Sequence, residues 1–235
     1  MIIVLSVGGS VISHGQHRFA EYARMLKSLS SDHTVFVVVG GGKIARDYIE
    51  RARTFGADEA FCDAIGILVT RLNARLLIAA LGDAAYPVPP ETQEDAVVAA
   101  LFGRIVVMGG TIPGHTTDAV AAILAEYARA DLLINATATD GIYTKDPKKH
   151  PDAVKLDEIS PEQLVGLIAA ERMGAGANLP LDMLAAKIIE RSGIPAAVID
   201  GSDPSNVLDA SSGKQIGTYV LVEPSSDPAH SKEAQ

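Results

Sequence analysis

Three glycine-rich turns, each directly after an apolar run rich in β-branched residues, constrain this chain most. They are Gly8–Ser10, Gly40–Lys43 and Gly109–Thr111. Glycine has no Cβ, so it adopts positive φ freely and lets backbone N–H groups face a ligand. At any single turn, the geometry of a strand-to-helix connection explains the glycines about as well as a bound ligand would. Three turns together favour a single site for phosphate groups.

Short β-branched runs alternate with longer helical patterns along the chain. Strands are predicted near 2–7, 34–39, 104–108, 131–136, 195–199 and 217–222. Helices are predicted near 18–30, 43–54, 61–81, 93–101, 117–129, 161–170 and 181–192. This alternation predicts an α/β protein, a three-layer αβα sandwich around a mostly parallel central sheet. Ligands of such sheets bind outside the carboxyl ends of the strands, where all three glycine turns fall.

The 235 residues allow one large domain, and we expect it to span 1–222. The segment 139–160 is polar and rich in turn residues, which indicates a functional loop or a small hairpin. Residues 223–235 lack large apolar side chains, so we expect a disordered tail there.

Composition excludes several classes of function. The net charge of -9 argues against a nucleic-acid partner, which needs a basic surface. The single Cys62 cannot form an intramolecular disulfide or a multi-cysteine metal site, which fits a cytoplasmic protein. Met1 leads into a strand-like run without a basic segment, so no signal peptide is expected. No stretch of membrane-spanning length and no membrane partner are expected either.

The second and third turns each lead into a predicted helix. A phosphate at the helix after Gly42 would meet free N–H groups, the positive end of the helix dipole, and the side chains of Lys43 or Arg46. Thr116 or Thr117 could cap the next helix or bind an oxyanion. Neither the P-loop pattern nor the dinucleotide-binding glycine pattern is present.

Taken together, these motifs resemble the amino acid kinase fold, and within it the archaeal type of uridylate (UMP) kinase. The resemblance runs in order from Met1 to about residue 222. Its most specific parts are Pro113–Asp118 and Asp140–Pro147, supported by Thr70–Ala74 and Leu184–Ile189.

The resemblance implies transfer of the γ-phosphoryl group of Mg-ATP to UMP, a step of pyrimidine nucleotide biosynthesis. It also implies a homohexamer built as a trimer of dimers, with Mg²⁺ carried on the nucleotide and no protein-bound metal. Two alternatives stay open. One is another kinase of the same fold, such as an isopentenyl phosphate, carbamate or acetylglutamate kinase. The other is a non-catalytic protein that stores or senses nucleotides or oxyanions.

The resemblance also implies site residues. For ATP they are Gly9, Ser10, Gly42, Arg46, Thr137, Ala138, Tyr143 and Asp146. For UMP they are Gly41, Asp63, Thr111, Ile112, Pro113, Gly114, His115, Thr116 and Thr117. Catalytic roles are expected for Asp140, which could order the metal or the phosphate, and for Lys43.

The chain departs from its relatives at Ser6, where many members of the fold carry a catalytic lysine. Lys43, Arg46 and Mg²⁺ are the candidates that could replace this positive charge. Ordinary structural roles also stay open: Asp140 as the start of an Asp-Gly turn, and Asp63 as a helix-start carboxylate. The apolar stripe of the 65–81 helix fits a core or a dimer contact.

Overall fold

The computed structural model describes residues 1–13, 17–147, 149–170 and 179–222. The expected disordered tail, 223–235, lies outside these residues. The main sheet has seven strands in the order β3-β2-β1-β4-β8-β9-β7. Their bounds are β1 Ile2–Val7, β2 Thr34–Val39, β3 Val106–Met108, β4 Leu132–Thr137, β7 Glu158–Ile159, β8 Ala196–Asp200 and β9 Thr218–Val220.

The first five strands of this order run parallel to one another, and β9 and β7 run in the opposite direction. The central strands are buried on both faces, which is why they read in the sequence as continuous apolar runs. The carboxyl ends of β1, β2 and β3 therefore bring the three glycine turns to one edge of the sheet, as predicted.

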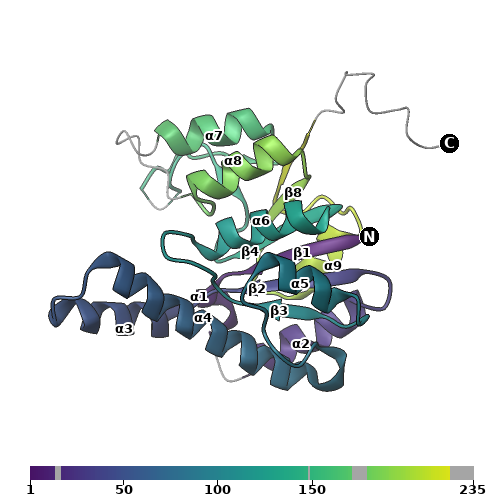
Figure 1. Cartoon of the computed structure of the whole chain (residues 1–235). Coiled ribbons are helices and arrows are strands. Elements are labelled where there is room, and N and C mark those ends of the chain that lie inside the picture. The colour runs from purple at the N-terminus through teal and green to yellow at the C-terminus, as the bar shows by residue number, and fades with distance from the viewer. Residues whose placement is uncertain (14–16, 148, 171–178, 223–235) are drawn as a thin grey trace.

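Helices cover both faces of the sheet (Figure 1). One face packs against α5 (Gln93–Ala100), α6 (Thr117–Ala128), α7 (Pro161–Ala170) and α8 (Met183–Ser192). The other face packs against α1 (Gly9–Ile12), α2 (Arg18–Leu29), α9 (Ser205–Ser211) and the second half of α4 (Glu59–Leu81). The predicted αβα sandwich is confirmed.

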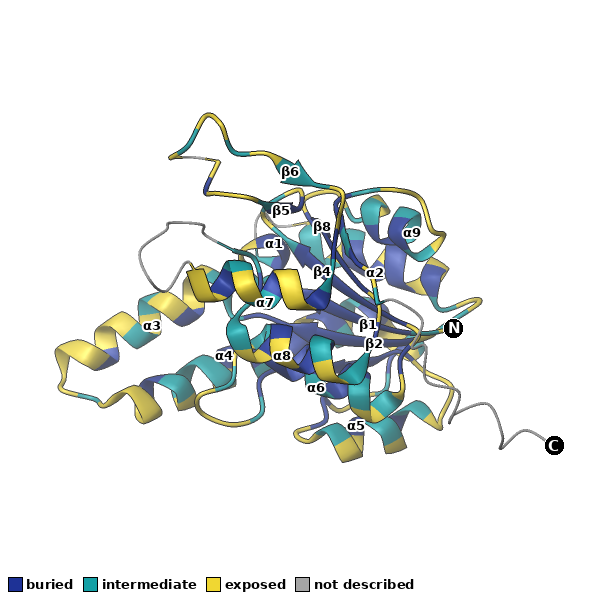
Figure 2. Ribbon diagram, turned by 90° about the horizontal axis from the view of Figure 1, so that it is seen from above, coloured by how far each residue is buried: buried dark blue, intermediate teal, exposed yellow. Residues whose placement is uncertain are grey.

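Helix α3 (Gly42–Thr54) and the first half of α4 form an arm that extends away from the sheet (Figure 1). Figure 2 shows that much of this arm is exposed. Several large apolar side chains on it face solvent, among them Phe55 at 88 % exposure, Phe61 and Leu68. The sheet alone therefore does not account for the apolar character of α4.

The segment 139–160 forms the small hairpin that was one of two expectations for it. Strands β5 (Ile142–Tyr143) and β6 (Lys155–Leu156) pair antiparallel. Edge strand β7, helices α1 and α9 and the single turn η1 (Gly82–Ala84) were not predicted. They are two to seven residues long, too short for hydrophobic periodicity to reveal them.

The expectation that no segment reaches membrane-spanning length is wrong, because one helix is long and apolar enough when judged by length and composition alone. Residues 59–84 form a helical run that contains an 18-residue window with a mean hydropathy of 1.7, and 33 % of that window is buried. The run also carries Arg71, and its buried polar residues Thr70 and Asn73 bind backbone groups of the glycine turns. These contacts make α4 a structural helix of the α/β fold.

Candidate functional site

The first and second glycine turns are in direct backbone contact. A Cβ placed on Gly9 would lie 2.0 Å from the backbone nitrogen of Gly42, and one placed on Gly40 would lie 2.4 Å from the nitrogen of Gly9. Gly42 also has a φ of 65°, in the left-handed region that favours glycine. These two turns therefore need glycine partly because their backbones pack directly against each other.

The third turn packs onto helix α4. A Cβ on Gly109 would lie 2.6 Å from the hydroxyl oxygen of Thr70 and 2.7 Å from the backbone nitrogen of Arg71. Gly110 donates its backbone N–H to the same Thr70 oxygen at 2.7 Å. The glycine pair of this turn thus lets the end of β3 come close to the helix.

A cavity of about 240 Å³ opens between α3, α4 and the start of α6. Seven residues predicted for substrate binding line it: Gly41, Gly42, Arg46, Asp63, His115, Thr116 and Thr117. The remaining lining residues are Ala45, Ile49, Gly66, Ile67, Thr70 and Gly110. The structure therefore brings together residues from all three of the sequence regions implied for UMP.

Helix α3 directs its amino end at this cavity. No side chain among the described residues caps that end, so the N–H groups of its first turn are left for a ligand. The helix dipole adds positive potential there, and Arg46 contributes a full positive charge from the second turn. The combination is suited to a phosphate group.

Asp63, on the first turns of α4, contacts the loop 111–117 across the cavity. One of its carboxylate oxygens accepts the backbone N–H of Gly114 at 2.8 Å. Gly114 has a φ of 85°, so glycine suits this turn of the loop. His115 follows with its ring Nδ1 buried and without a hydrogen-bond partner in the described part of the chain.

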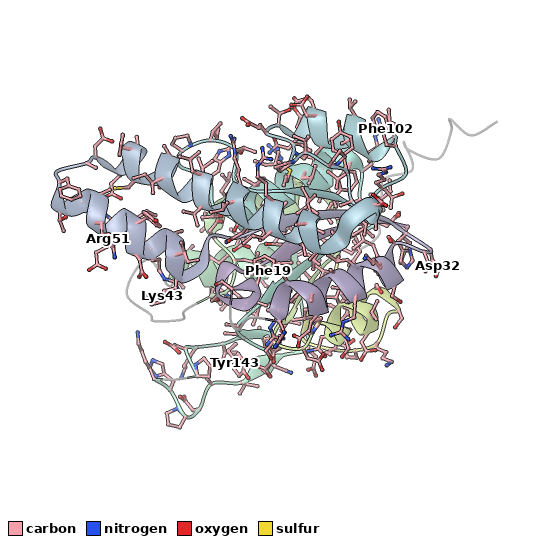
Figure 3. All side chains as sticks on the ribbon, turned by 90° about the horizontal axis from the view of Figure 1, so that it is seen from below. Phe19, Asp32, Lys43, Arg51, Phe102 and Tyr143 are labelled. Carbon is pink, nitrogen blue, oxygen red and sulfur yellow. The ribbon has the colours of Figure 1, made fainter. Side chains whose placement is uncertain are left out.

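Lys43 and Arg46 lie differently, although both are on α3. Lys43, labelled in Figure 3, forms an ion pair with Asp47 at 2.5 Å through its Nζ on the exposed face of the helix. It does not line the cavity. Arg46 does line it. Exposed i,i+4 pairs contribute little free energy, so the Lys43 side chain can leave Asp47 at small cost.

Five other predicted residues of the acceptor loop and first turn do not line the cavity. Ser10 and Ile112 are exposed, as are Pro113 and Gly114, and Thr111 is half-buried. Thr116 caps helix α6 by accepting the N–H of Ala119 at 3.1 Å. The predicted capping role of Thr116 is thereby confirmed.

A polar network that the sequence did not assign lies beneath the loop. Ser6 donates its hydroxyl hydrogen to Asp118 at 2.9 Å, and Thr116 donates to Asp182, which caps α8. Burial raises the pKa of the Asp118 carboxyl to about 6, with a smaller lowering by the Ser6 hydroxyl and a raising by Asp182. A polar Ser6 inside an apolar strand was the signal that could have revealed this network.

The predicted ATP residues beyond the first two turns lie in two places: Thr137 and Ala138 at the end of β4, and Tyr143 and Asp146 on the hairpin. Gly8 donates its N–H to Ala136 at 2.9 Å, and Gly201 donates to Thr137 at 2.8 Å, so the ends of β1, β4 and β8 meet. Ala138 follows as an exposed residue, and Tyr143 lies on the hairpin (Figure 3).

Asp140 is held at the base of the hairpin. The Tyr143 hydroxyl donates to one of its oxygens at 2.9 Å, and Lys155 Nζ lies 3.4 Å from the other. Desolvation raises the pKa of Asp140, but the bonds from Tyr143 and Lys155 outweigh it and the pKa is lowered. Asp146 is buried in the hairpin turn, with Lys149 Nζ 3.7 Å from its carboxylate.

Thr218, which sequence reasoning missed, anchors both strands of the hairpin. Its hydroxyl accepts the backbone N–H of Ile142 at 2.8 Å and donates to the carbonyl of Leu156. The side chain is fully buried at the end of the sheet. A lone threonine at a strand start carries no distinctive pattern, so the sequence gives no sign of this role.

Comparison with known proteins gives one consistent result. Residues 1–200 match the model of the amino acid kinase family. The chain is 52 % identical over 220 residues to the uridylate kinase of Archaeoglobus fulgidus, covering 94 % of this chain and 100 % of the relative. It is 49 % identical to the uridylate kinase of Methanococcoides burtonii, with coverage of 94 % and 100 %.

The crystal structure of the Archaeoglobus fulgidus uridylate kinase superposes with a TM-score of 0.86, covering 94 % of this chain and 100 % of that one at 49 % identity. Family model, curated relatives and solved structure therefore agree over nearly the whole chain. The chain belongs to the amino acid kinase family, among the archaeal uridylate kinases.

Proposed function

We propose that this protein transfers the γ-phosphoryl group of ATP to UMP and releases UDP and ADP. The observation that carries the proposal is the cavity in which the amino end of α3, Asp63 and His115–Thr117 meet. It offers N–H groups and Arg46 for a phosphate and a carboxylate for ribose hydroxyls. The full-length relatives named uridylate kinases support the same substrate.

In this proposal the two nucleotides lie on either side of the contact between the first two glycine turns. UMP occupies the cavity, with Gly41, Asp63 and the residues of the loop 111–117 around it. ATP occupies the side of Gly8 on which Thr137, Ala138, Tyr143 and Asp146 lie. Its phosphates reach Gly9, Ser10, Gly42 and Arg46. The reacting oxygens then meet above Gly9 and Gly42, whose backbones are in contact.

Phosphoryl transfer asks the protein mainly for positioning and for stabilisation of negative charge. Backbone N–H groups at the start of α3 and the side chains of Arg46 and Lys43 supply part of that stabilisation. Lys43 would act after its ion pair with Asp47 breaks. It would replace part of the positive charge of the lysine that many members of the fold carry at the position of Ser6. Asp140 is the second catalytic candidate, oriented by Tyr143 and Lys155.

Mg²⁺ fits the residues present. Within the described residues no three His, Cys, Asp or Glu side chains form a metal-binding group, and Mg²⁺ commonly takes only one or two carboxylates when phosphates and water complete its shell. In this proposal the ion arrives on ATP with phosphate oxygens and water as its ligands, and it would neutralise charge on the phosphate oxygens. Asp182 is engaged elsewhere, because it accepts the N–H groups of Leu184 and Ala185 and the Thr116 hydroxyl.

The exposed arm supports self-association with a second copy of this chain. Phe61, Leu68, Leu72 and Leu76 repeat along one face of α4 and are 49 to 65 % exposed. A further groove of about 710 Å³ lies between Tyr48, Phe55 and Phe61 and is mostly apolar. Large exposed apolar patches mark interaction sites. We propose that this face pairs two subunits and that three such dimers form a hexamer.

The proposal also includes one domain over 1–222, a cytoplasmic location and a role in pyrimidine nucleotide synthesis. The test of the reaction is a coupled assay of ADP release with ATP and Mg²⁺ against UMP, CMP, dUMP, AMP and GMP. Turnover with UMP far above the purine nucleotides is expected. Absence of turnover with UMP would contradict the proposal, and nucleotide-dependent melting shifts without turnover would favour a binding protein.

A further inference from the structure

Helix α4 carries three neighbouring polar residues that the proposed reaction leaves unexplained. Thr70, Arg71 and Asn73 lie in its middle, and Thr70 and Asn73 are 6 % and 2 % exposed. A buried polar side chain in a largely apolar helix needs hydrogen-bond partners, and the identity of those partners shows what the residue does. All three residues bind backbone groups of the glycine turns.

Asn73 holds the second turn. Its side-chain nitrogen donates to the carbonyl of Gly40 at 2.8 Å and lies 3.4 Å from that of Gly41. Both carbonyls belong to the segment that leads into α3, whose amino end faces the cavity. Asn73 therefore fixes where that helix starts relative to α4.

Thr70 and Arg71 hold the third turn. Thr70 accepts the buried N–H of Gly110 at 2.7 Å and donates to the carbonyl of Ile67 at 2.6 Å, so its hydroxyl joins the third turn to α4. Arg71 donates to the carbonyls of Gly110 and Thr111 at 3.2 and 3.4 Å and pairs with Glu91 at 2.7 Å. The two residues fix the start of the acceptor loop.

We infer that Thr70, Arg71 and Asn73 are positioning residues for phosphoryl transfer: α4 clamps the second and third glycine turns at the spacing that the reaction needs. This inference rests on the proposed function. It also predicts different effects of these residues on the binding of the two substrates. The hydrogen bonds of Thr70 and Arg71 to the glycine turns reach the loop proposed for UMP, whereas those of Asn73 reach the turn that both nucleotides share.

The hydroxyl of Thr70 gives the sharpest test. Thr70→Val keeps the shape of the side chain but leaves the N–H of Gly110 without an acceptor, and Thr70→Ser restores that acceptor. We expect Thr70→Val to raise KM for UMP roughly tenfold or more, because small displacements of a substrate-binding loop have large effects, with KM for ATP nearly unchanged. Thr70→Ser should recover most of the loss.

Asn73→Ala is the companion variant, and it should raise KM for both nucleotides. Thr54→Val, at the exposed end of α3, is the matched control and should behave as wild type. A purely structural role would lower thermal stability in both buried variants and give them the same substrate profile. Equal effects of Thr70→Val on both substrates, or no recovery with Thr70→Ser, would overturn the inference.

The same variants separate this inference from the proposed function. Isothermal titration calorimetry gives Kd for UMP without turnover, and Kd should rise in Thr70→Val as KM does. If the wild-type protein binds UMP but does not phosphorylate it, the reaction is wrong and Kd still decides the role of Thr70. If it does not bind UMP at all, or if Thr70→Val folds and keeps the wild-type Kd, the inference is wrong.

Discussion

The carboxylate of Asp63 and the backbone N–H of Gly114 are joined by a hydrogen bond of 2.8 Å across the candidate UMP cavity. The bond ties the loop 111–117 to α4 and uses one of the two carboxylate oxygens. An ionised carboxylate accepts several hydrogen bonds, and within the described residues the other oxygen is left for a ribose hydroxyl. Asp63 thus has a structural role and a proposed binding role in the same side chain.

Asp63→Ala removes both roles, and we expect KM for UMP to rise by roughly tenfold or more while KM for ATP changes little. Asp63→Asn keeps an oxygen that can accept the Gly114 N–H, so it should lose less. Asp83→Ala, in the exposed turn η1 that follows α4, serves as the control in the same steady-state assay. Equal rises of KM for the two nucleotides would contradict a ribose-binding role.

The variants Lys43→Met and Arg46→Met test the catalytic roles of the two cationic side chains of α3 one at a time. Because both are proposed to stabilise negative charge during transfer, we expect kcat to fall roughly tenfold or more in each variant. Lys27→Met, on α2, controls for the loss of a surface charge. If Lys43→Met keeps the wild-type kcat, Lys43 has no catalytic role and its pair with Asp47 is all that it does.

Asp118 predicts a particular pH dependence of stability. Burial raises its pKa in the folded protein to about 6, above the usual value of 3.8. The folded state therefore binds the proton more tightly, and this stabilisation is full below pH about 4 and is lost as the pH rises through about 6. Between pH 4 and pH 8, the free energy of unfolding of Asp118→Asn should therefore rise relative to that of wild type by about 1–3 kcal/mol.

Thermal melts of the wild type and Asp118→Asn at a series of pH values measure this difference. The comparison at each pH cancels the titration of the other carboxylates. A stability difference that does not change between pH 4 and pH 8 would show that Asp118 titrates normally in the folded protein.

The hairpin that carries Tyr143 depends on Thr218. Thr218→Val removes the acceptor for the Ile142 N–H and the donor to Leu156, so the hairpin should move relative to the sheet. We expect KM for ATP to rise several-fold with KM for UMP unchanged, and Thr218→Ser to restore it. The opposite substrate profile would mean that the hairpin does not bind ATP.

The exposed ridge of α4 predicts the assembly. Leu72→Glu places a charge in the centre of the proposed dimer contact, where an unpaired buried charge is costly. Multi-angle light scattering should give a lower mass for Leu72→Glu than for wild type, and Val88→Glu, exposed outside the arm, should keep the wild-type mass. A monomeric wild-type protein would refute the proposed hexamer.

Much of the fold was predictable because its signals are long or periodic. The strands at 2–7 and 34–39 match β1 and β2 in full, since both are continuous apolar runs buried on two faces. Helix α7 was predicted at its observed bounds. Strand β7 was not, because two residues at a sheet edge carry no periodic signal.

The residues of the candidate site were predictable from the sequence, but only some of the contacts between them were. The glycine turns were expected to let a ligand approach, yet Gly9 and Gly109 are also required by contacts with Gly42 and Thr70. Such contacts join residues far apart in sequence, so no local pattern shows them. The roles of Asn73 and Thr218 are of the same kind.

UMP and ATP are proposed to bind on opposite sides of the contact between Gly9 and Gly42. A crystal structure with UMP and a non-hydrolysable ATP analogue would show both positions. We expect the UMP phosphate at the amino end of α3, the ribose hydroxyls at Asp63 and the adenine nucleotide beside Tyr143. UMP outside the 240 Å³ cavity, or both nucleotides on one side of that contact, would contradict the proposal.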